Sequence, residues 1–309
     1  MSAESIVPIG RFAPSPTGPL HFGSLLAAVG SYCLARQGGG RWLLRIEDLD
    51  RPREVAGAAD EIMRTLEALA LFWDGEVVWQ SRRSERYAEI LARLDGMGLV
   101  FGCTCSRKEI LASAPHAGEE GPIYPGTCRS GLAPGRRARA WRLRVPSSQV
   151  CLTDGVFGPQ SQCLADEVGD FVLRRADGLF AYQLAVVVDD ADAGVTQVVR
   201  GQDLLTSTPR QVYLQECLRF PHPRYIHLPL ALAAEGKKIS KRHGAVAVGR
   251  DSGEQLWQAL RFLGQAVPVT LRGAPPAEVL DWGVRYFELA RVPKDPRVPE
   301  PLKKSAPGG

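Results

Sequence analysis

Hydrophobic and polar positions follow two different periods in the first hundred residues. Apolar runs at 6–12 and 42–46 predict two short strands. Apolar residues spaced three and four positions apart after Ser24, and again over 58–71, predict two helices, and three successive glycines at 38–40 end the first of them. The order strand, helix, strand, helix predicts a parallel sheet that is covered by helices on both faces.

The composition of the sequence changes between residues 103 and 139, where Gly, Pro and Cys dominate and the hydrophobic positions no longer follow a period. We interpret this stretch as an inserted module. The nearly continuous apolar run 181–188 then predicts a strand that is buried on both faces. Further helices are predicted at 204–218, 252–263 and 276–290.

Composition narrows the class of protein. The 309 residues are 45% hydrophobic, which suffices for a large core and for more than one domain. No apolar run reaches the roughly 18 residues that a membrane helix needs, and the first residues lack the pattern of a signal peptide, so we expect a cytoplasmic protein without membrane contacts. A net charge of +4 permits a polyanionic partner but does not require one. Seven cysteines, an odd number, argue against a framework of disulfides.

The segment between the first predicted strand and the first predicted helix contains residues that suit a phosphate group. Gly23 and Ser24 are small, so the backbone can approach a ligand closely. The helix that begins here offers free amide groups to phosphate, and His21 can donate a hydrogen bond. A histidine before a helix is more often a cap, so this segment alone is weak evidence.

A second candidate segment is the basic loop at 238–242, which contains Lys238, Lys241 and Arg242. A loop of this kind can close over a triphosphate and neutralise the charge that develops in the transition state. Short Lys/Arg runs are usually just solvated, so this loop alone is also weak evidence. The two segments taken together, on either side of an alternating α/β pattern, indicate nucleotide chemistry.

Both segments resemble motifs of a known enzyme family. Residues 21–24 are similar to the HIGH motif, and residues 238–242 to the KMSKS loop, of the class I aminoacyl-tRNA synthetases, with mild departures from both motifs. Three more segments resemble the glutamyl branch of this family, namely 11–18, 45–50 and 199–210. The resemblance spans about residues 6–248 and implies a Rossmann-type parallel-sheet α/β catalytic domain that uses ATP with Mg²⁺.

The resemblance also implies which residues hold the substrates. ATP is expected to contact His21, Gly23, Ser24 and Lys241, with His21, Lys238 and Lys241 as the catalytic residues. Glutamate is expected to contact Arg11, Phe12, Ala13, Pro14, Ser15, Glu47, Tyr182 and Arg200.

The chemistry of these residue types agrees with a glutamate pocket. Glutamate carries two carboxylates and one ammonium group, so its pocket needs two arginines and one acid. Arginine suits this role because it binds carboxylate as a planar fork. Arg11 and Glu47 stand where parallel strands are predicted to end, the usual ligand edge of such sheets, which argues against plain surface ion pairs. We expect this pocket to reject glutamine, whose side chain is neutral. Tyr182 has the alternative role of a core residue, and Gln202 stands where the family has an acid.

Three cysteines, Cys103, Cys105 and Cys128, predict a structural zinc site. Chemistry alone nominates His116 as the fourth ligand, whereas the family resemblance implies Tyr124 through the spacing Tyr-x-Gly-x-Cys. A metal can lower the pKa of a phenol from its ordinary value near 10, and we choose Tyr124. The alternative is a set of three reduced cysteines without a metal.

Six arginines are candidate contacts for RNA phosphates, namely Arg36, Arg136, Arg137, Arg139, Arg142 and Arg144. A solvated basic surface is an equally good interpretation of these residues.

The sequence predicts five parts. They are the first half of the catalytic domain at 1–102, a zinc-binding insertion at 103–140, the rest of the connecting region and the second half of the catalytic domain at 141–244, a small helical extension of the type that contacts a tRNA stem at 245–291, and a disordered tail at 292–309.

The part of the chain after Lys241 is too short for the anticodon-binding region of a glutamyl-tRNA synthetase, since a domain usually needs roughly 100–150 residues. The chain therefore resembles a truncated branch of that family, a ligase that activates glutamate without tRNA and transfers it to the modified base queuosine at the wobble position of tRNA(Asp). We expect this activity, in a monomer. The alternatives are a minimal synthetase that charges the 3′ end of tRNA, an inactive paralogue that binds nucleotide or RNA, and a zinc-dependent RNA-binding module.

Overall fold

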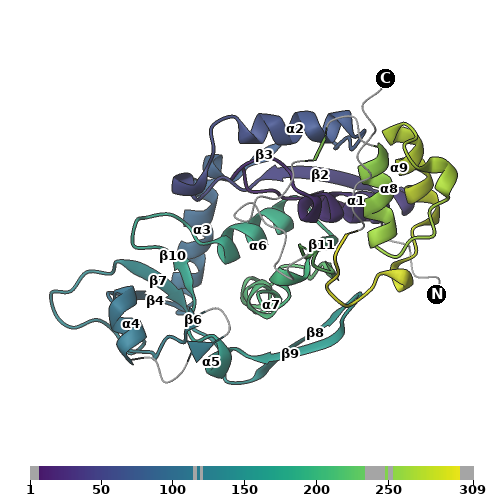
Figure 1. Ribbon diagram of the computed structural model, residues 1–309. Coiled ribbons are helices and arrows are strands. Elements are labelled where there is room, and N and C mark those ends of the chain that lie inside the picture. Colours follow the sequence, from purple (N-terminus) through teal and green to yellow (C-terminus); the bar gives the residue numbers. More distant parts are fainter. Residues whose placement is uncertain (1–6, 114–116, 119–120, 234–247, 250–252, 300–309) are drawn as a thin grey trace.

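The structure is a computed structural model, and it describes residues 7–113, 117–118, 121–233, 248–249 and 253–299. It consists of an α/β domain from which an elongated region, residues 100–174, projects (Figure 1). This region contains the predicted insertion 103–140 and is called the insertion below. Lys238 and Lys241, and the alternative zinc ligand His116, lie outside the described residues.

Five short parallel strands form the centre of the catalytic domain. One sheet contains β1 (Ile9–Phe12), β2 (Arg41–Ile46) and β3 (Val78–Trp79), and a second contains β11 (Gln197–Gly201) and β12 (Arg224–Leu228). The two sheets lie side by side, because the Thr196 amide donates to the Ile9 carbonyl at 3.0 Å. The neighbours of β1 are thus β2 on one side and β11 on the other. This change of direction creates a topological switch point, where open α/β sheets bind ligands.

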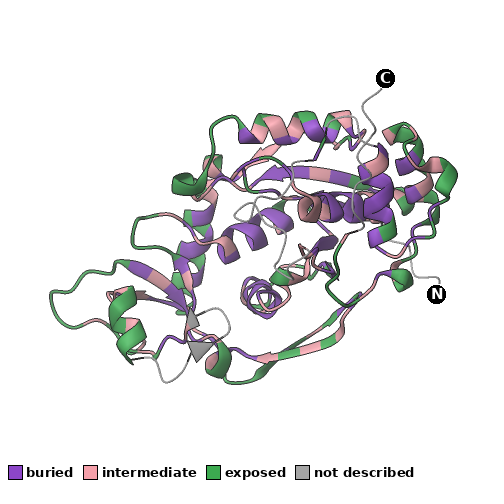
Figure 2. Cartoon of the chain, in the orientation of Figure 1, coloured by how far each residue is buried: buried purple, intermediate pink, exposed green. Residues whose placement is uncertain are grey.

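Helices cover both faces of this parallel arrangement (Figure 1). They are α1 (Phe22–Gln37), α2 (Ala58–Ala68), α3 (Ser84–Gly96), α6 (Tyr182–Asp192) and α7 (Thr208–Leu218). Short 3₁₀ turns lie at Arg51–Arg53, Gln80–Arg82, Gln202–Leu204, Val269–Leu271 and Leu289–Arg291. Helices α1 and α6 lie in two separate hydrophobic cores, and α6 is buried along most of its length (Figure 2). In the part of the chain that the structure describes, no helix is long and apolar enough to cross a membrane.

The insertion is built on an antiparallel sheet. Its strands, in the order β10-β7-β4, are Val172–Arg174, Ala140–Leu143 and Val100–Cys103. Around this sheet lie α4 (Arg107–Ser113), β5 (Ala117–Gly118), β6 (Gly121–Pro122), β8 (Gln149–Asp154), β9 (Gly158–Cys163) and α5 (Leu164–Glu167). The hairpin of β8 and β9 returns to the catalytic domain, where the Gly155 amide donates to the Tyr225 carbonyl at 2.9 Å.

Two helices, α8 (Gly253–Phe262) and α9 (Pro276–Tyr286), pack against α1. We predicted disorder from residue 292 onward, and for 292–299 this prediction is wrong. Arg297 exchanges backbone hydrogen bonds with Leu230 and Leu232 at 3.1 and 2.9 Å, and Val292 is buried. These tertiary bonds hold a segment whose composition favours disorder. Residues 300–309 lie outside the described residues.

The strands and helices predicted in the first hundred residues are confirmed as β1, α1, β2 and α2. The strand predicted at 181–188 is wrong, because this segment belongs to helix α6. Residues 183–190 are all buried, so the helix has no polar face and shows no amphipathic period. A short apolar run of this kind does not distinguish a buried strand from a buried helix.

We predict that Gly40→Ala destabilises the fold by about 1–3 kcal/mol. A Cβ at this position lies 1.9 Å from the Pro8 carbonyl oxygen, so the start of β2 must shift away from β1. Gly96→Ala is the matched control, because its Cβ meets no atom of the described chain within 4 Å. Urea unfolding of the three proteins measures the effect. Equal midpoints for the two variants contradict the prediction.

Candidate active site

Four of the predicted glutamate-binding residues meet at the carboxyl ends of the parallel strands. Arg11 lies in β1, Glu47 directly follows β2, and Arg200 lies in β11. Tyr182 is the first residue of α6, and its hydroxyl lies 3.4 Å from the Arg200 guanidinium. Burial raises the pKa of Tyr182, and the charges of Arg200, Glu47 and Arg11 all act on this phenol. Segments far apart in sequence therefore bring two cations, one acid and one phenol into a single site.

A buried carboxylate, Asp190 of α6, fixes the orientation of the groups around β1 and β2. Its Oδ1 accepts hydrogen bonds from Arg11 Nε at 3.2 Å and from Arg45 Nη1 at 2.6 Å. Burial by itself raises the pKa of Asp190, but the two arginines hold it below its ordinary value. Arg45 also donates to Glu47 at 3.2 Å. Burial raises the pKa of Glu47 in spite of Arg45 and Arg11, so a cation placed beside it favours its ionised form.

A histidine and a second carboxylate hold Arg200. Arg200 Nε donates to His227 Nε2 at 3.0 Å, so this ring nitrogen carries the lone pair. The proton is therefore on Nδ1, which donates to Asp154 Oδ2 at 2.7 Å. Burial lowers the pKa of His227 although the hydrogen bond to Asp154 opposes this, and the imidazole is neutral. Asp154 also accepts from the backbone amides of Val156 and Phe157 at 3.0 and 2.9 Å.

The first turn of α7 completes the surroundings of Arg200. Its Nη2 donates to Thr208 Oγ1 at 2.8 Å, and the Thr208 hydroxyl donates to the Leu204 carbonyl at 3.0 Å. The guanidinium lies over the Tyr225 ring at 5.3 Å from the centroid. These contacts direct Nη1 of Arg200 toward Tyr182.

Sequence reasoning missed Asp189 and Asp190 because the segment was interpreted as a strand. Asp189 accepts from Gln80 Nε2 at 2.7 Å, from Tyr87 at 2.8 Å and from Arg83 at 2.5 Å, and so joins α6 to the beginning of α3. Two acids at the end of an apolar run were an available signal, because buried charges need partners. Asp154 and His227 gave no such signal, since 73 positions separate them in the chain.

His21 is the N-cap of α1 in this structure. Its Nδ1 accepts from the Ser24 amide at 3.2 Å, and its Nε2 lies 3.1 Å from the Ser24 hydroxyl. Gly23 lies in the same first turn, so the three residues predicted to contact ATP stand together at the switch point. Lys241, the fourth residue predicted to contact ATP, and Lys238, predicted to be catalytic, lie outside the described residues.

The remaining predicted glutamate residues form the segment after β1. The Pro14 carbonyl accepts from the Glu47 amide at 3.0 Å, which brings Ala13, Pro14 and Ser15 beside the end of β2. The Phe12 side chain instead lies in the core, where its ring stacks on Trp42 at 6.2 Å between centroids. Because the Phe12 side chain is in the core, only its backbone can make the predicted contact with glutamate.

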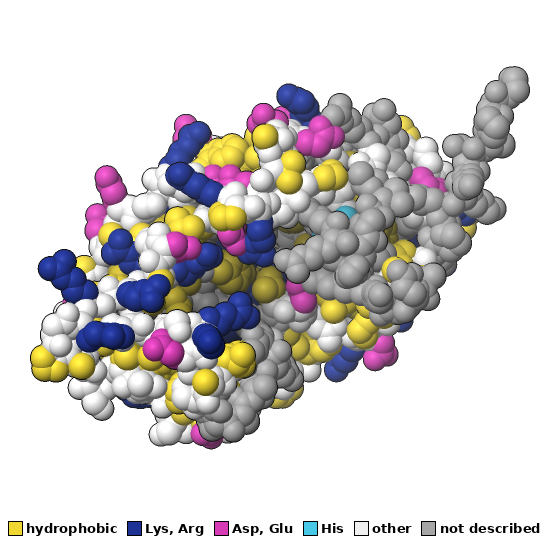
Figure 3. All heavy atoms as spheres, turned by 60° about the vertical axis from the view of Figure 1, so that its left-hand side comes forward, with side chains coloured by type: hydrophobic (Ala, Val, Ile, Leu, Met, Phe, Trp, Pro, Cys, Tyr) yellow, Lys and Arg dark blue, Asp and Glu magenta, His cyan; other side chains and the backbone are white. Residues whose placement is uncertain are grey.

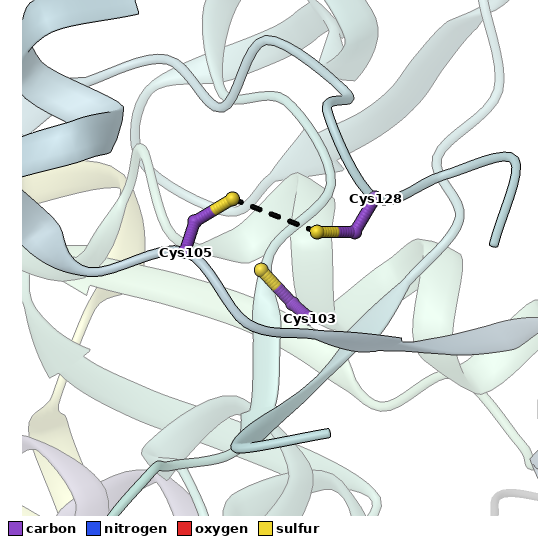
Figure 4. A group of neighbouring side chains, drawn as sticks. All are labelled: Cys103, Cys105 and Cys128. Carbon is purple, nitrogen blue, oxygen red and sulfur yellow. Dashed lines mark hydrogen bonds between the residues drawn. The ribbon is translucent and has the colours of Figure 1, made fainter. Parts of the chain in front are cut away.

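The four predicted zinc ligands also lie together, in the insertion. Figure 4 shows the side chains of Cys103, Cys105 and Cys128 pointing toward one another, and their sulfurs all lie within 4.8 Å of each other. The Tyr124 hydroxyl lies 3.5 Å from Cys103 Sγ and 3.9 Å from Cys105 Sγ. It also accepts a hydrogen bond from the Cys128 amide at 2.8 Å. The three thiols with the phenol make a compact set of four donors.

The thiols of this cluster differ in acidity. Burial raises the pKa of Cys105 to about 11. Burial also opposes ionisation of Cys128, but hydrogen bonds from Thr104, Tyr124 and Cys105 lower its pKa to about 6. Cys128 thus ionises more readily than Cys105, and the thiolate is the form of cysteine that binds a metal.

The six arginines that we considered as phosphate contacts divide into two groups. Three make contacts inside the protein, namely Arg36, Arg142 and Arg144. Three are exposed in the loop before β7, namely Arg136, Arg137 and Arg139. The second group is accessible to a polyanion, and the first group stabilises the fold.

Comparison with known proteins places this geometry in a family. Residues 9–279 match the family described as tRNA synthetases class I (E and Q), catalytic domain. The chain is 57% identical over 287 residues to the glutamyl-Q tRNA(Asp) synthetase of Dechloromonas aromatica. This alignment covers 92% of this chain and 95% of the relative. It is 56% identical over 293 residues to the glutamyl-Q tRNA(Asp) synthetase of Geobacter sulfurreducens. This alignment covers 92% of this chain and 93% of the relative.

Solved structures agree with the sequence comparison. A glutamate tRNA ligase from Elizabethkingia meningosepticum, in complex with its amino acid, superposes with a TM-score of 0.78 at 26% identity. The match covers 94% of this chain and 67% of that chain. The chain therefore belongs to the class I tRNA synthetases of the E and Q type and, within them, to the glutamyl-Q tRNA(Asp) synthetases.

Proposed function

We propose that this protein activates L-glutamate with ATP, without tRNA, and transfers the glutamyl group to the queuosine base at the wobble position of tRNA(Asp). The observation that carries the proposal is the meeting of Arg11, Glu47, Tyr182 and Arg200 at the switch point, beside the N-terminus of α1. Relatives whose names state this activity match more than nine-tenths of the chain, which supports the choice of acceptor.

Glutamate binds with its charges opposite those of the site. Arg11 and Arg200 each receive one carboxylate, and the Tyr182 hydroxyl assists Arg200, from which it lies 3.4 Å away. Glu47 receives the ammonium group, which offsets the effect of burial on its carboxylate. Glutamine is excluded because its neutral amide leaves one of the guanidinium groups without a carboxylate partner.

ATP lies with its phosphates at the N-terminus of α1, near His21, Gly23 and Ser24. The sequence motif adds Lys238 and Lys241 as further phosphate contacts, and both lie outside the described residues. Mg²⁺ accompanies the phosphates. The α-carboxylate oxygen of glutamate attacks the α-phosphorus in line, the mixed anhydride bond forms, and pyrophosphate leaves. The helix amides and the lysines stabilise the charge that accumulates on the phosphate oxygens.

In the second step a hydroxyl of the queuosine cyclopentene ring attacks the carbonyl carbon of glutamyl-adenylate. The ester bond forms, the bond to the phosphate oxygen breaks, and AMP leaves. The phosphate of the departing AMP accepts the hydroxyl proton. Helices α8 and α9 contact the tRNA stem, and one monomer suffices because one chain supplies all the residues named.

We also propose that Cys103, Cys105, Cys128 and Tyr124 bind one structural zinc ion. Zinc–sulfur bonds of about 2.3 Å in a tetrahedron place neighbouring sulfurs about 3.8 Å apart, and Cys105 Sγ lies 3.6 Å from Cys128 Sγ. The spacing of the phenol oxygen from two of the sulfurs, 3.5 and 3.9 Å, suits the same tetrahedron. The ion joins β4 to the Tyr124 segment and has no role in the chemistry.

The position of the glutamyl group tests the function directly. We expect radiolabelled glutamate to appear in the anticodon fragment after nuclease digestion of queuosine-containing tRNA(Asp), and not on the same tRNA with guanine at the wobble position. Label at the 3′ end, or labelling that does not depend on queuosine, contradicts the proposal and favours an ordinary synthetase. Absence of glutamate-dependent ATP–pyrophosphate exchange favours an inactive paralogue.

We predict that His227→Leu and Thr208→Val raise the KM for glutamate in ATP–pyrophosphate exchange by about tenfold or more, the scale of a lost hydrogen bond to a charged group. Both substitutions remove an acceptor from Arg200. The KM for ATP should change less than twofold.

Thr65→Val is the matched control for Thr208→Val, because the Thr65 hydroxyl also donates to the carbonyl four residues earlier in a buried helix turn, at 2.8 Å. It should leave both KM values unchanged. A parallel rise of both KM values in the Thr208 variant shows a general loss of structure instead of a loss of glutamate binding.

We predict one zinc ion per purified chain by elemental analysis. Tyr124→Phe and Cys128→Ser should weaken zinc binding at least tenfold in competition with a chromophoric chelator, since loss of even an outer-shell partner costs 10–100-fold. Cys151→Ser is the control, because Cys151 is exposed in β8 and outside the cluster. Unchanged zinc affinity of Tyr124→Phe excludes the phenol as a ligand.

A further inference from the structure

Arg200 differs from the other arginines of the candidate site in its electrical surroundings. Arg11 and Arg45 both donate to the carboxylate of Asp190, at 3.2 and 2.6 Å, so a negative charge of the protein balances them. The Lys and Arg side chains on the face drawn in Figure 3 lie at the surface, where water and salt screen their charge. Arg200 is only 4% exposed, and its hydrogen-bond partners in the described chain are all neutral.

A buried guanidinium with neutral partners is ready to pair with an anion. Burial of a charge without a counter-charge is costly, so a carboxylate that reaches Arg200 recovers more free energy than one that reaches an arginine already paired within the protein. In the proposed function this anion is a carboxylate of glutamate. The guanidinium must nevertheless be fixed in orientation, because a two-pronged contact with a carboxylate depends on its plane.

His227 fixes the guanidinium without neutralising it. Its Nε2 accepts from Arg200 Nε at 3.0 Å, and its ring stacks on Tyr225 at 6.4 Å between centroids. Burial lowers the pKa of His227 although the hydrogen bond to Asp154 opposes this, and the ring is neutral. A neutral imidazole supplies a lone pair but no negative charge. The nearest carboxylate in this chain of contacts, that of Asp154, is thus one residue removed from Arg200.

Asp154 decides which ring nitrogen of His227 carries the proton. A neutral histidine has two tautomers, and only one of them accepts at Nε2. Asp154 Oδ2 lies 2.7 Å from Nδ1, and a carboxylate can only accept, so it selects the tautomer with the proton on Nδ1. Burial opposes ionisation of Asp154, but the hydrogen bonds from His227 and from two backbone amides hold its pKa below the ordinary value. Solvent reaches neither side chain, since both are 0% exposed.

The turn that carries Asp154 is docked on β12. The Gly155 amide donates to the Tyr225 carbonyl at 2.9 Å. Asp154 Oδ1 accepts from two amides of the same turn at 3.0 and 2.9 Å, whereas Oδ2 accepts from the ring and the backbone amide of His227 at 2.7 and 3.1 Å. One oxygen of the carboxylate therefore stabilises the turn, and the other sets the state of His227.

We propose that Asp154 is a positioning residue for glutamate, which acts by keeping the proton of His227 on Nδ1. His227 then orients Arg200 as a neutral acceptor, and the charge of Arg200 stays available to a carboxylate of the ligand. The identity of the ligand rests on the proposed function. The inference assigns to the β8–β9 hairpin, a part of the insertion, a role in amino-acid binding without contact with the amino acid.

Asp154→Asn tests the inference because it replaces one oxygen by an NH2 group at nearly constant volume. The remaining oxygen can still accept from the two amides of the turn, but the NH2 group donates to Nδ1 and the ring proton moves to Nε2. There it meets a second donor, Arg200 Nε, which must turn away. We expect the KM for glutamate in ATP–pyrophosphate exchange to rise about tenfold or more. The KM for ATP should change by less than about twofold.

Asp170→Asn is the matched control. Asp170 is also a buried carboxylate of the insertion that accepts from a backbone amide, that of Val145 at 2.9 Å. Its other partner is Arg129, and it contacts neither His227 nor Arg200. Both KM values of this variant should stay close to those of the wild type, so a general effect of a lost buried charge is separated from the effect on Arg200.

Nitrogen NMR of protein labelled with ¹⁵N-histidine gives a readout that a loss of structure does not imitate. The signals of His227 are identified by their absence from the spectrum of His227→Leu. In the wild type, Nε2 should resonate as an unprotonated ring nitrogen and Nδ1 as a protonated one. In Asp154→Asn the two nitrogens should exchange these characters. The measurement needs no substrate.

Two substitutions of His227 test the acceptor separately from the ring. Glutamine is long enough to place its amide oxygen near the position of Nε2, whereas asparagine is one methylene shorter and does not reach Arg200. We expect the KM for glutamate of His227→Gln to lie closer to the wild type than that of His227→Asn. Both variants lose the aromatic ring, so a loss of packing alone affects them alike.

The inference requires a raised KM for glutamate together with the inverted tautomer in Asp154→Asn. Either change without the other, or neither of them, overturns it while the proposed function stands. If the wild type shows no glutamate-dependent exchange, the proposed function fails, and the tautomer in Asp154→Asn still decides whether Asp154 controls His227. If Asp154→Asn does not fold, equal KM values of His227→Gln and His227→Asn overturn the inference.

Discussion

The candidate glutamate site depends on one buried carboxylate, that of Asp190. The guanidinium groups of Arg11 and Arg45 both donate to the same oxygen of Asp190. Arg45 also donates a hydrogen bond to Glu47. A buried charge without a partner costs several kcal/mol, so none of these groups can be placed independently of the others. The requirement that the charges meet ties β1, β2 and α6 into one relative arrangement, and the same arrangement presents Arg11 and Glu47 to a ligand.

The second arginine of the site is held by a part of the chain that belongs to the insertion. Asp154 lies at the end of β8, and through His227 it orients Arg200. The imidazole must remain neutral to accept from Arg200 and donate to Asp154, and burial provides that state. The β8–β9 hairpin thus connects the insertion to the candidate amino-acid pocket by hydrogen bonds, in addition to the connection along the chain.

The segment that leads into α7 lies between the candidate glutamate site and a cavity beside the insertion. One side of this segment contacts Arg200 through Thr208, and the other side lines the cavity. An enzyme that joins an amino acid to a base inside a folded RNA must position two reactants of different chemistry at short range.

The sequence by itself determined the α/β class, the first strands and helices, and the residue types of both candidate sites. Arg11 and Glu47 could be found because they follow short strands directly, and strand ends converge by a general rule of parallel sheets. The cysteine cluster could be found because its members are close in the chain and their spacing itself indicates a metal.

Tertiary structure alone decided the partners that hold these residues. The run at 181–188 is apolar on every side, so its helical state, and with it the position of Asp190, follows from burial in the core and not from a period. Asp154 and His227 are 73 residues apart and meet only because β8 returns to β12. The tail at 292–299 is ordered by backbone bonds to Leu230 and Leu232, which no local pattern encodes. Local chemistry can be read along the chain, whereas contacts between distant segments depend on how the whole chain minimises unpaired buried charge and exposed apolar surface.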